Sequence, residues 1–247
     1  YTTLKSVYNV PATTGTQLEV YYDGQDYSAD TDFDQANEVL DKSGNNLHGS
    51  QTGGVGFDPT YKAFTFDGSG DSISRVITNS QGAYVHSWST WVKLDTLSGQ
   101  ILWHLGLDGT GGTGGSDTSS IYIESDGSLN WFWWSNDVKF SNQKLITGTW
   151  YHLAGSYNGG APISSRKLWI NGIEQVISST SGSQLNTALG LEANTTLRLG
   201  TRYNGGDFLD GSIANFRIYS KALNADQIKE LYDYQKDYFL GSKSQVT

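Results

Sequence analysis

The chain has 247 residues, and its 16 Lys and Arg against 25 Asp and Glu give a formal net charge of −9. It contains no cysteine, which excludes a disulfide framework and any site that needs a thiolate. The acidic balance comes without a block of Lys or Arg, and nucleic acids and anionic membrane surfaces require such a basic patch, so we expect neither as a partner.

The hydropathy pattern and the first residues bear on the setting of the chain. No apolar run approaches the ~18 residues of a membrane-spanning helix, so no membrane insertion is expected. The N-terminal YTTLKSVYNV lacks the pattern of a signal peptide, and the absence of Met predicts a module taken from a longer protein. We expect residues 1–17 to lead into one domain over 18–239, followed by a linker over 240–247.

Short runs rich in Trp, Tyr, Val, Ile and Thr alternate with clusters of Gly, Asn, Asp and Ser, a rhythm typical of an all-β sandwich. The predicted strands are 63–67, 87–93, 100–107, 121–125, 128–135, 150–157, 166–170, 196–201 and 211–220. Asn171-Gly172 and Asp126-Gly127 predict hairpin turns, because these residue pairs tolerate the positive φ that tight turns need. Segment 108–120 is Gly-rich with nothing to bury, and we expect a mobile loop there.

One helix is predicted, near the C-terminus. Asn224 can cap it, Gln227 stands three residues later as in a capping box, and apolar residues follow at helical spacing. Beyond Phe239 the sequence Gly-Ser-Lys-Ser ends the pattern.

Five segments then resemble successive pieces of one family. They are FTFDGSGDSI at 64–73, SWSTWVKLD at 87–95, TGTWYHLAGSY at 147–157, KLWINGIE at 167–174 and LRLGTRYNGGDFLDGSIANFRIY at 197–219. Over about residues 18–232, the chain resembles the LamG-like jelly roll of the concanavalin A-like lectin/glucanase superfamily. It implies a two-sheet antiparallel jelly-roll sandwich with one short C-terminal helix. The superfamily hosts lectins, hydrolases, lyases and adhesive modules, so the fold alone does not give the function.

The tail at 230–247, ELYDYQKDYFLGSKSQVT, is similar to a stretch that follows such modules in virion surface proteins of large algal DNA viruses. This similarity implies an outward-facing location, extracellular or on a virion surface. It also implies neighbouring domains of a longer parent chain as partners.

The densest aromatic group predicts a sugar-binding surface. Alternation along a strand places Trp131 and Trp133 on one face and Phe132 and Trp134 on the other, so the outward face carries a large ring on which a sugar can stack. Loop 202–208 adds a further aromatic, an amide and a carboxylate on a Gly-rich backbone. The predicted ligand-binding residues are Trp134, Phe132, His104, Tyr203, Asn204 and Asp207.

Residues 41–49, DKSGNNLHG, are similar to the family segment D-x-S-G-N-x-x-x-G, which often contributes to a bound Ca²⁺. The resemblance implies a structural Ca²⁺ held by Asp41, Asn46 and Asp210. The family strand G-x-I-D has Ala214 in place of its carboxylate, so one expected ligand is missing. In the alternative interpretation, Asp41 and Asn46 form a turn by bonding their own backbone.

No catalytic motif stands out. A retaining glycosidase needs two carboxylates roughly 5 Å apart; Glu124 and Asp126 alternate on one strand, but Ser128 replaces a third member and Asp126 heads the turn. The ordinary interpretation of Glu124 is a charge at a strand end. The four histidines lack metal-ligand spacing, and we expect satisfied strand or loop residues.

We therefore expect a non-catalytic carbohydrate-binding or adhesion module of a larger surface protein, with a glycan or polysaccharide on a cell surface as its partner. Two alternatives remain open. One is a structural spacer of a virion or fibre that binds no sugar, and the other is a polysaccharide-active lyase or hydrolase whose carboxylates come from separate strands.

Overall fold

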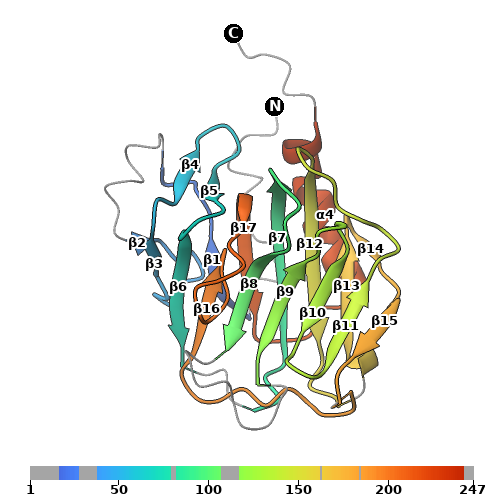
Figure 1. The fold of residues 1–247 in the computed structure, drawn as a ribbon. Coiled ribbons are helices and arrows are strands. Elements are labelled where there is room, and N and C mark those ends of the chain that lie inside the picture. The colour runs from blue at the N-terminus through green and yellow to red at the C-terminus, as the bar shows by residue number, and fades with distance from the viewer. Residues whose placement is uncertain are drawn as a thin grey trace.

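The computed structural model describes residues 17–27, 38–78, 82–106, 117–161, 163–183 and 185–241. These residues form two antiparallel sheets packed face to face, with one α-helix beside them (Figure 1). The arrangement confirms the predicted all-β jelly-roll sandwich with a C-terminal helix.

The eight-stranded first sheet contains, in spatial order, β14 (Ile173–Glu174), β13 (Arg166–Ile170), β12 (Trp150–Tyr157), β7 (His86–Leu94), β17 (Asp210–Tyr219), β5 (Ala63–Asp67) and β4 (Gly56–Asp58), and β1 (Leu18–Tyr22) also pairs with β17. The nine-stranded second sheet contains β15 (Ser179–Ser181), β11 (Asp137–Phe140), β10 (Leu129–Phe132), β9 (Ser119–Ile123), β8 (Gln100–Gly106), β16 (Thr195–Leu199), β6 (Ser72–Ile77), β3 (Gly49–Thr52) and β2 (Glu38–Val39). A short 3₁₀ turn, η1 (Ile163–Ser165), precedes β13.

Each of the nine predicted strands has an observed counterpart, and β14 follows the predicted turn at Asn171-Gly172. Seven further strands have no predicted counterpart: β1, β2, β3, β4, β6, β11 and β15. The missed strands are short, and several are polar; β15, for example, is exposed along its whole length. Such segments become strands because a neighbouring strand offers hydrogen-bond partners for their backbone. The alternation of side chains within the segment itself is too weak to predict a strand.

Three tryptophans join the sheets at the centre of the core. Trp88 on β7 packs edge-to-face against Trp103 on β8 and Trp131 on β10, with ring centroids 5.5 and 6.0 Å apart. All three side chains are fully buried. The alternation predicted for the aromatic run is confirmed here, because Trp131 and Trp133 face the core.

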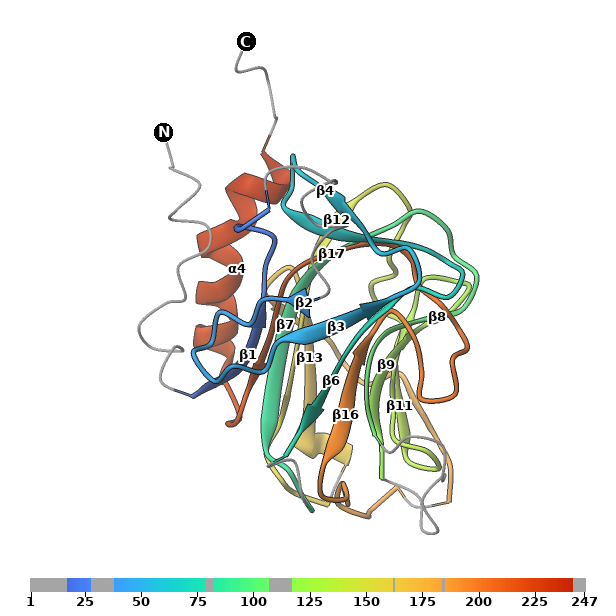
Figure 2. The same cartoon turned by 90° about the vertical axis from the view of Figure 1, so that its left-hand side faces the viewer.

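The helix α4 (Ala225–Leu240) covers the outer face of the first sheet (Figure 2). The predicted capping box is present: Gln227 N donates to Asn224 Oδ1 and Asn224 N donates to Gln227 Oε1. Trp91 of β7 stacks on Phe239 with centroids 4.4 Å apart and donates a hydrogen bond to Gln235. The helix thus covers the first sheet, and in the described part of the chain no helix lies on the outer face of the second sheet.

Some predictions concern residues that the structure does not describe. These are residues 1–16 of the lead-in, 242–247 of the linker, and 108–116 of the Gly-rich loop. The domain boundaries at 18 and 239 stay a prediction. In the described part of the chain, no helix has the length and apolar character needed to cross a membrane.

Candidate functional site

A pocket of about 290 Å³ lies on the outer face of the second sheet. Strands β8, β9 and β10 form its floor, and the loop 200–209 between β16 and β17 borders it. The described residues that line it are Ile101, His104, Thr118, Ser120, Tyr122, Glu124, Asn130, Phe132, Trp134, Arg202, Tyr203 and Asp207. Its volume lies near the lower limit of small-molecule sites, which hold roughly 300–1,000 Å³, so it suits one or two sugar rings.

Strand register brings the floor residues together. In one row across three strands, Phe132 of β10 lies opposite Ser120 of β9, and Ser120 lies opposite His104 of β8. Their neighbours Trp131 and Ile121 are fully buried in the core. Because side chains alternate along a strand, the row of Phe132, Ser120 and His104 faces outward.

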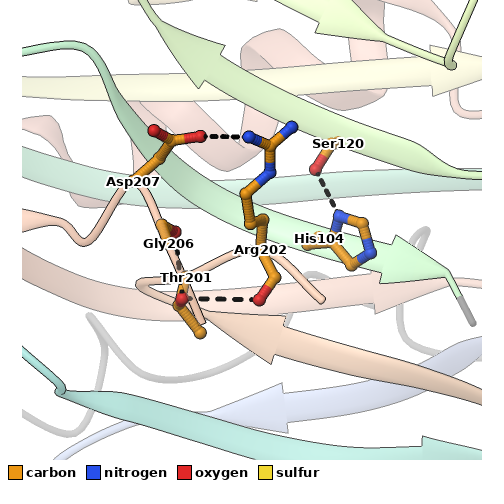
Figure 3. A network of polar contacts seen from close by, with 6 residues as sticks. All are labelled: His104, Ser120, Thr201, Arg202, Gly206 and Asp207. Atoms are coloured by element: carbon orange, nitrogen blue, oxygen red, sulfur yellow. Dashed lines mark hydrogen bonds and ion pairs between the residues drawn. The ribbon is translucent and has the colours of Figure 1, made fainter. Parts of the chain in front are cut away.

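The loop 200–209 is closed by its own polar contacts (Figure 3). Arg202 Nη1 donates to Asp207 Oδ2 at 2.8 Å, and Thr201 Oγ1 donates to the carbonyl of Gly206 at 3.1 Å. The backbone carbonyl of Asp207 accepts from Ile101 N at 2.8 Å, which anchors the loop to β8. The contacts hold Tyr203, within this closed loop, at the pocket.

His104 is almost fully buried in the pocket wall, with 2% of its surface exposed. Its Nδ1 lies 2.9 Å from Ser120 Oγ, and its ring lies 5.8 Å from the ring of Tyr203. Burial, with smaller contributions from Arg198 and Arg202, lowers the pKa of His104 to about 3. The ring is therefore neutral at physiological pH. Among the described residues its Nε2 has no hydrogen-bond partner, contrary to the satisfied histidine that the sequence predicts.

Trp134 is half exposed, with 42% of its surface accessible, whereas the other seven tryptophans are buried. It lies just beyond the end of β10, with φ of 52°, a backbone region that bulky residues rarely adopt. Its ring meets the edge of Phe132 at a centroid distance of 5.7 Å. Non-glycine residues at positive φ occur in turns and also at ligand-binding positions.

Five of the six predicted ligand-binding residues line this pocket: Trp134, Phe132, His104, Tyr203 and Asp207. The sixth, Asn204, is not among the lining residues. The pocket also includes Glu124 and Arg202, which are not among the predicted ligand-binding residues. From the sequence pattern alone, Glu124 is interpreted as a charge at a strand end. Along β9, Ser120 and Tyr122 alternate with the apolar Ile121 and Ile123. This alternation is visible in the sequence and predicts the outward face of β9, but it does not predict which strands lie beside β9.

The predicted calcium ligands are not brought together. Asp41 forms a β-bridge with Tyr22, and Tyr22 pairs with Phe216 of β17. Asp210, which pairs with Asp67, lies six residues before Phe216 on the same strand. Each strand residue adds ~3.3 Å, so the two carboxylates lie at distant points of that strand.

The contacts of Asp41 agree instead with the turn interpretation. Its Oδ1 accepts from the backbone N–H groups of Tyr21 and Ser43, and its Oδ2 accepts from Ser43 Oγ and Leu47 N. These four donors occupy the roughly four lone-pair sites of a carboxylate, which leaves none for a metal. Among the described residues no group of three His, Cys, Asp or Glu could hold a metal ion. The residues therefore do not fit the ion, and a bound Ca²⁺ stays a prediction that melting curves with Ca²⁺ and with EDTA can test.

The family model described as the concanavalin A-like lectin/glucanases superfamily (Laminin_G_3) matches residues 67–229, more than half of the chain. No protein with a curated description matches the chain by sequence.

Several solved structures share the fold. Domain 4 of AbnA, a GH43 extracellular arabinanase from Geobacillus stearothermophilus in complex with arabinotriose, aligns with a TM-score of 0.64 and 23% identity over 87% of this chain and 98% of that one. The binding domain of botulinum neurotoxin serotype D aligns with a TM-score of 0.63 and 19% identity, over 90% and 53%. Trypanosoma rangeli sialidase in complex with sialic acid aligns with a TM-score of 0.65 and 14% identity, over 93% and 34%. The chain thus spans about half of the toxin domain and a third of the sialidase.

Proposed function

Since the chain belongs to the concanavalin A-like lectin/glucanases superfamily, we propose that it is a non-catalytic carbohydrate-binding module and that the outer-face pocket is its glycan site. One observation carries the proposal. An exposed tryptophan, a second aromatic ring and a closed polar loop meet at one pocket on the sheet face that the helix leaves open. This combination gives a sugar both an apolar surface and hydrogen-bonding groups.

The binding mechanism follows from the chemistry of sugar rings. One face of a pyranose or furanose presents C–H groups, and Trp134 and Phe132 offer apolar surface to them. The hydroxyl groups at the edge of the ring then meet Asp207, Tyr122 and the other polar side chains. A site with one or two rings in contact binds weakly as a single copy, so function would rely on several copies acting together.

The neighbouring structures support a glycan as the partner. The arabinanase domain was solved with arabinotriose and the sialidase with sialic acid. Because these two structures are 23% and 14% identical to the chain, they support a fold that can carry a glycan site, and they do not locate the site.

An enzyme remains the second candidate, because Glu124 and Asp207 line the same pocket although they come from separate elements. Two carboxylates across a sugar are what glycosidases use. Asp207, however, is already held in an ion pair with Arg202. Incubation with neutral and acidic polysaccharides, followed by assays for reducing ends and for unsaturated products, tests this candidate.

We also propose that the module faces outward as part of a larger surface protein. The proposal of a virion surface in particular rests on the resemblance of residues 230–247. A spacer without sugar binding is the corresponding alternative, and it predicts a folded protein that binds no glycan.

A glycan array with the purified chain and two variants tests the proposed function. The wild type should bind a defined set of glycans, and Trp134→Ala should lose those hits. Tyr234→Ala is the matched control, because Tyr234 is also a half-exposed aromatic but lies on α4, away from the pocket. A blank array with well-folded protein, or hits that survive Trp134→Ala, would contradict the proposal.

A further inference from the structure

The charged side chains that line the pocket carry more negative than positive charge. Among the described residues that line it, three side chains are charged: the carboxylates of Glu124 and Asp207 and the guanidinium of Arg202. Arg202 is already paired with Asp207 at 2.8 Å, so Glu124 adds a negative charge that no lining cation matches. The nearby Arg198 is 8% exposed on β16 and is not a lining residue. An anionic ligand would therefore bring a second negative charge against Glu124, which is unfavourable.

The proton positions at His104 can be assigned from its partner. Ser120 Oγ lies 3.1 Å from the carbonyl of Trp103 and donates its hydroxyl proton there. With its proton on that carbonyl, Ser120 accepts from His104, and we assign the proton of the neutral ring to Nδ1. It follows that Nε2 carries a lone pair. This nitrogen is shielded from solvent, and no described residue is its hydrogen-bond partner.

Asn130 contributes a second acceptor of the same kind. It lies opposite Tyr122 in the row next to that of His104, and its Oδ1 is shielded and has no partner in the described part of the chain. Among the described residues that line the pocket, these two atoms are the ones that are buried and unsatisfied. A buried acceptor without a donor costs about 1–3 kcal/mol, and a ligand that supplies an O–H group recovers that cost.

From these features we infer that the pocket selects uncharged, hydroxyl-rich sugars and disfavours sugars that carry carboxylate or sulfate groups. Hydroxyl groups donate to His104 Nε2 and Asn130 Oδ1, whereas a carboxylate or sulfate offers only acceptors and meets Glu124. The inference rests on the proposed function and narrows it to one class of glycan.

Matched pairs of oligosaccharides test the selectivity. The panel contains β-1,4-mannan against β-1,4-mannuronan, galactan against galacturonan, and agarose against carrageenan oligosaccharides. Titration calorimetry of the full chain at low salt should show binding to at least one neutral member. The charged member of that pair should bind about tenfold more weakly, and the ratio should shrink as salt screens the repulsion.

Two charge variants separate the pocket from the net charge of the protein. Glu124→Gln should raise the relative affinity for the charged member of the bound pair about fivefold. Glu174→Gln is the control, because it removes the same charge from β14 in the first sheet and should leave the ratio as in the wild type. In ¹⁵N spectra, the Nε2 resonance of His104 should shift when the neutral sugar binds.

The outcomes are distinguishable from failure of the proposed function. If no member of the panel or the array binds, the carbohydrate-binding role itself is wrong. If a charged member binds as tightly as its neutral partner or more tightly, the role stands and the selectivity is wrong. An equal response of the ratio to Glu124→Gln and Glu174→Gln would also overturn the selectivity.

Discussion

At the scale of single residues, Trp134 combines two unfavourable properties. Its ring is half exposed, and its backbone has a positive φ that costs an ordinary residue on the order of 1 kcal/mol. The adjacent Ser135 also has a positive φ, of 69°. A ligand-binding role gives both properties a reason, since the strained turn directs the ring toward the pocket.

The strain predicts an unusual order of stability for two variants. Glycine adopts positive φ without a steric penalty, so Trp134→Gly should be more stable than Trp134→Ala by about 1 kcal/mol, whereas glycine is normally the less stable of the two in regular structure. Urea unfolding measures the difference. Should the alanine variant be the more stable one, the backbone at Trp134 is not strained as described.

At the scale of elements, the turn between β10 and β11 depends on a residue from the opposite sheet. Arg166 of β13 is buried, and its guanidinium lies 3.9 Å from the ring centre of Trp133. It donates to the backbone carbonyl of Asn136 at 2.7 Å and to Asn136 Oδ1 at 2.6 Å. Arg166 thus holds the turn that carries Trp134 and acts as a positioning residue for the pocket.

We expect Arg166→Met to lower the free energy of unfolding by roughly 1–3 kcal/mol, because it removes the guanidinium that donates to the carbonyl and to Oδ1 of Asn136. It should also weaken glycan binding at temperatures where the variant is folded. Arg217→Met is the matched control: Arg217 is equally buried, stacked 4.2 Å from the ring centre of Tyr21, but it belongs to the first sheet. Calorimetric titration at 15 °C compares them, and equal losses of affinity would contradict the positioning role.

The same elements show how far the sequence could predict the site. Alternation in the aromatic run correctly separates the buried Trp131 and Trp133 from Phe132. Trp134 also points outward as predicted, but it lies in a turn beyond β10 rather than within a strand. Alternation is a local property, so one segment suffices to reveal it.

Other members of the site depend on contacts between distant segments. Glu124 reaches the pocket because β9 lies between β8 and β10, and Arg202 reaches it because β16 pairs with β8. Strand order and register of this kind cannot be read from a single sequence. The predicted pairing of Asp41 with Asp210 failed for the same reason, since their distance depends on which part of β17 each element meets.

At the scale of the whole molecule, three buried histidines couple stability to pH. Burial is the main cause that lowers the pKa of His86 to about 4 and those of His104 and His152 to about 3. In the unfolded chain these groups titrate near ~6.5. Between these values the unfolded chain binds protons that the folded protein does not, so stability is complete above about pH 6.5 and is lost as the pH falls.

The expected loss between pH 7 and pH 5 is about 2 kcal/mol for each histidine, from ~1.4 kcal/mol per unit of pKa. Burial raises the pKa of Asp23 and Asp137, and these carboxyls oppose the loss at lower pH. Urea unfolding at pH 7, 6 and 5 measures the slope, and His152→Phe should remove about a third of it. A stability that does not change over this range would contradict the account.

The most direct test of the central claim is to locate a bound sugar on the folded molecule. In ¹H–¹⁵N spectra, titration with the neutral oligosaccharide that binds best should move the indole resonance of Trp134 and the ring resonances of His104. The resonances of α4 should stay in place. Changes confined to α4 or to the outer face of the first sheet, with Trp134 unmoved at saturation, would show that the outer-face pocket is not the glycan site.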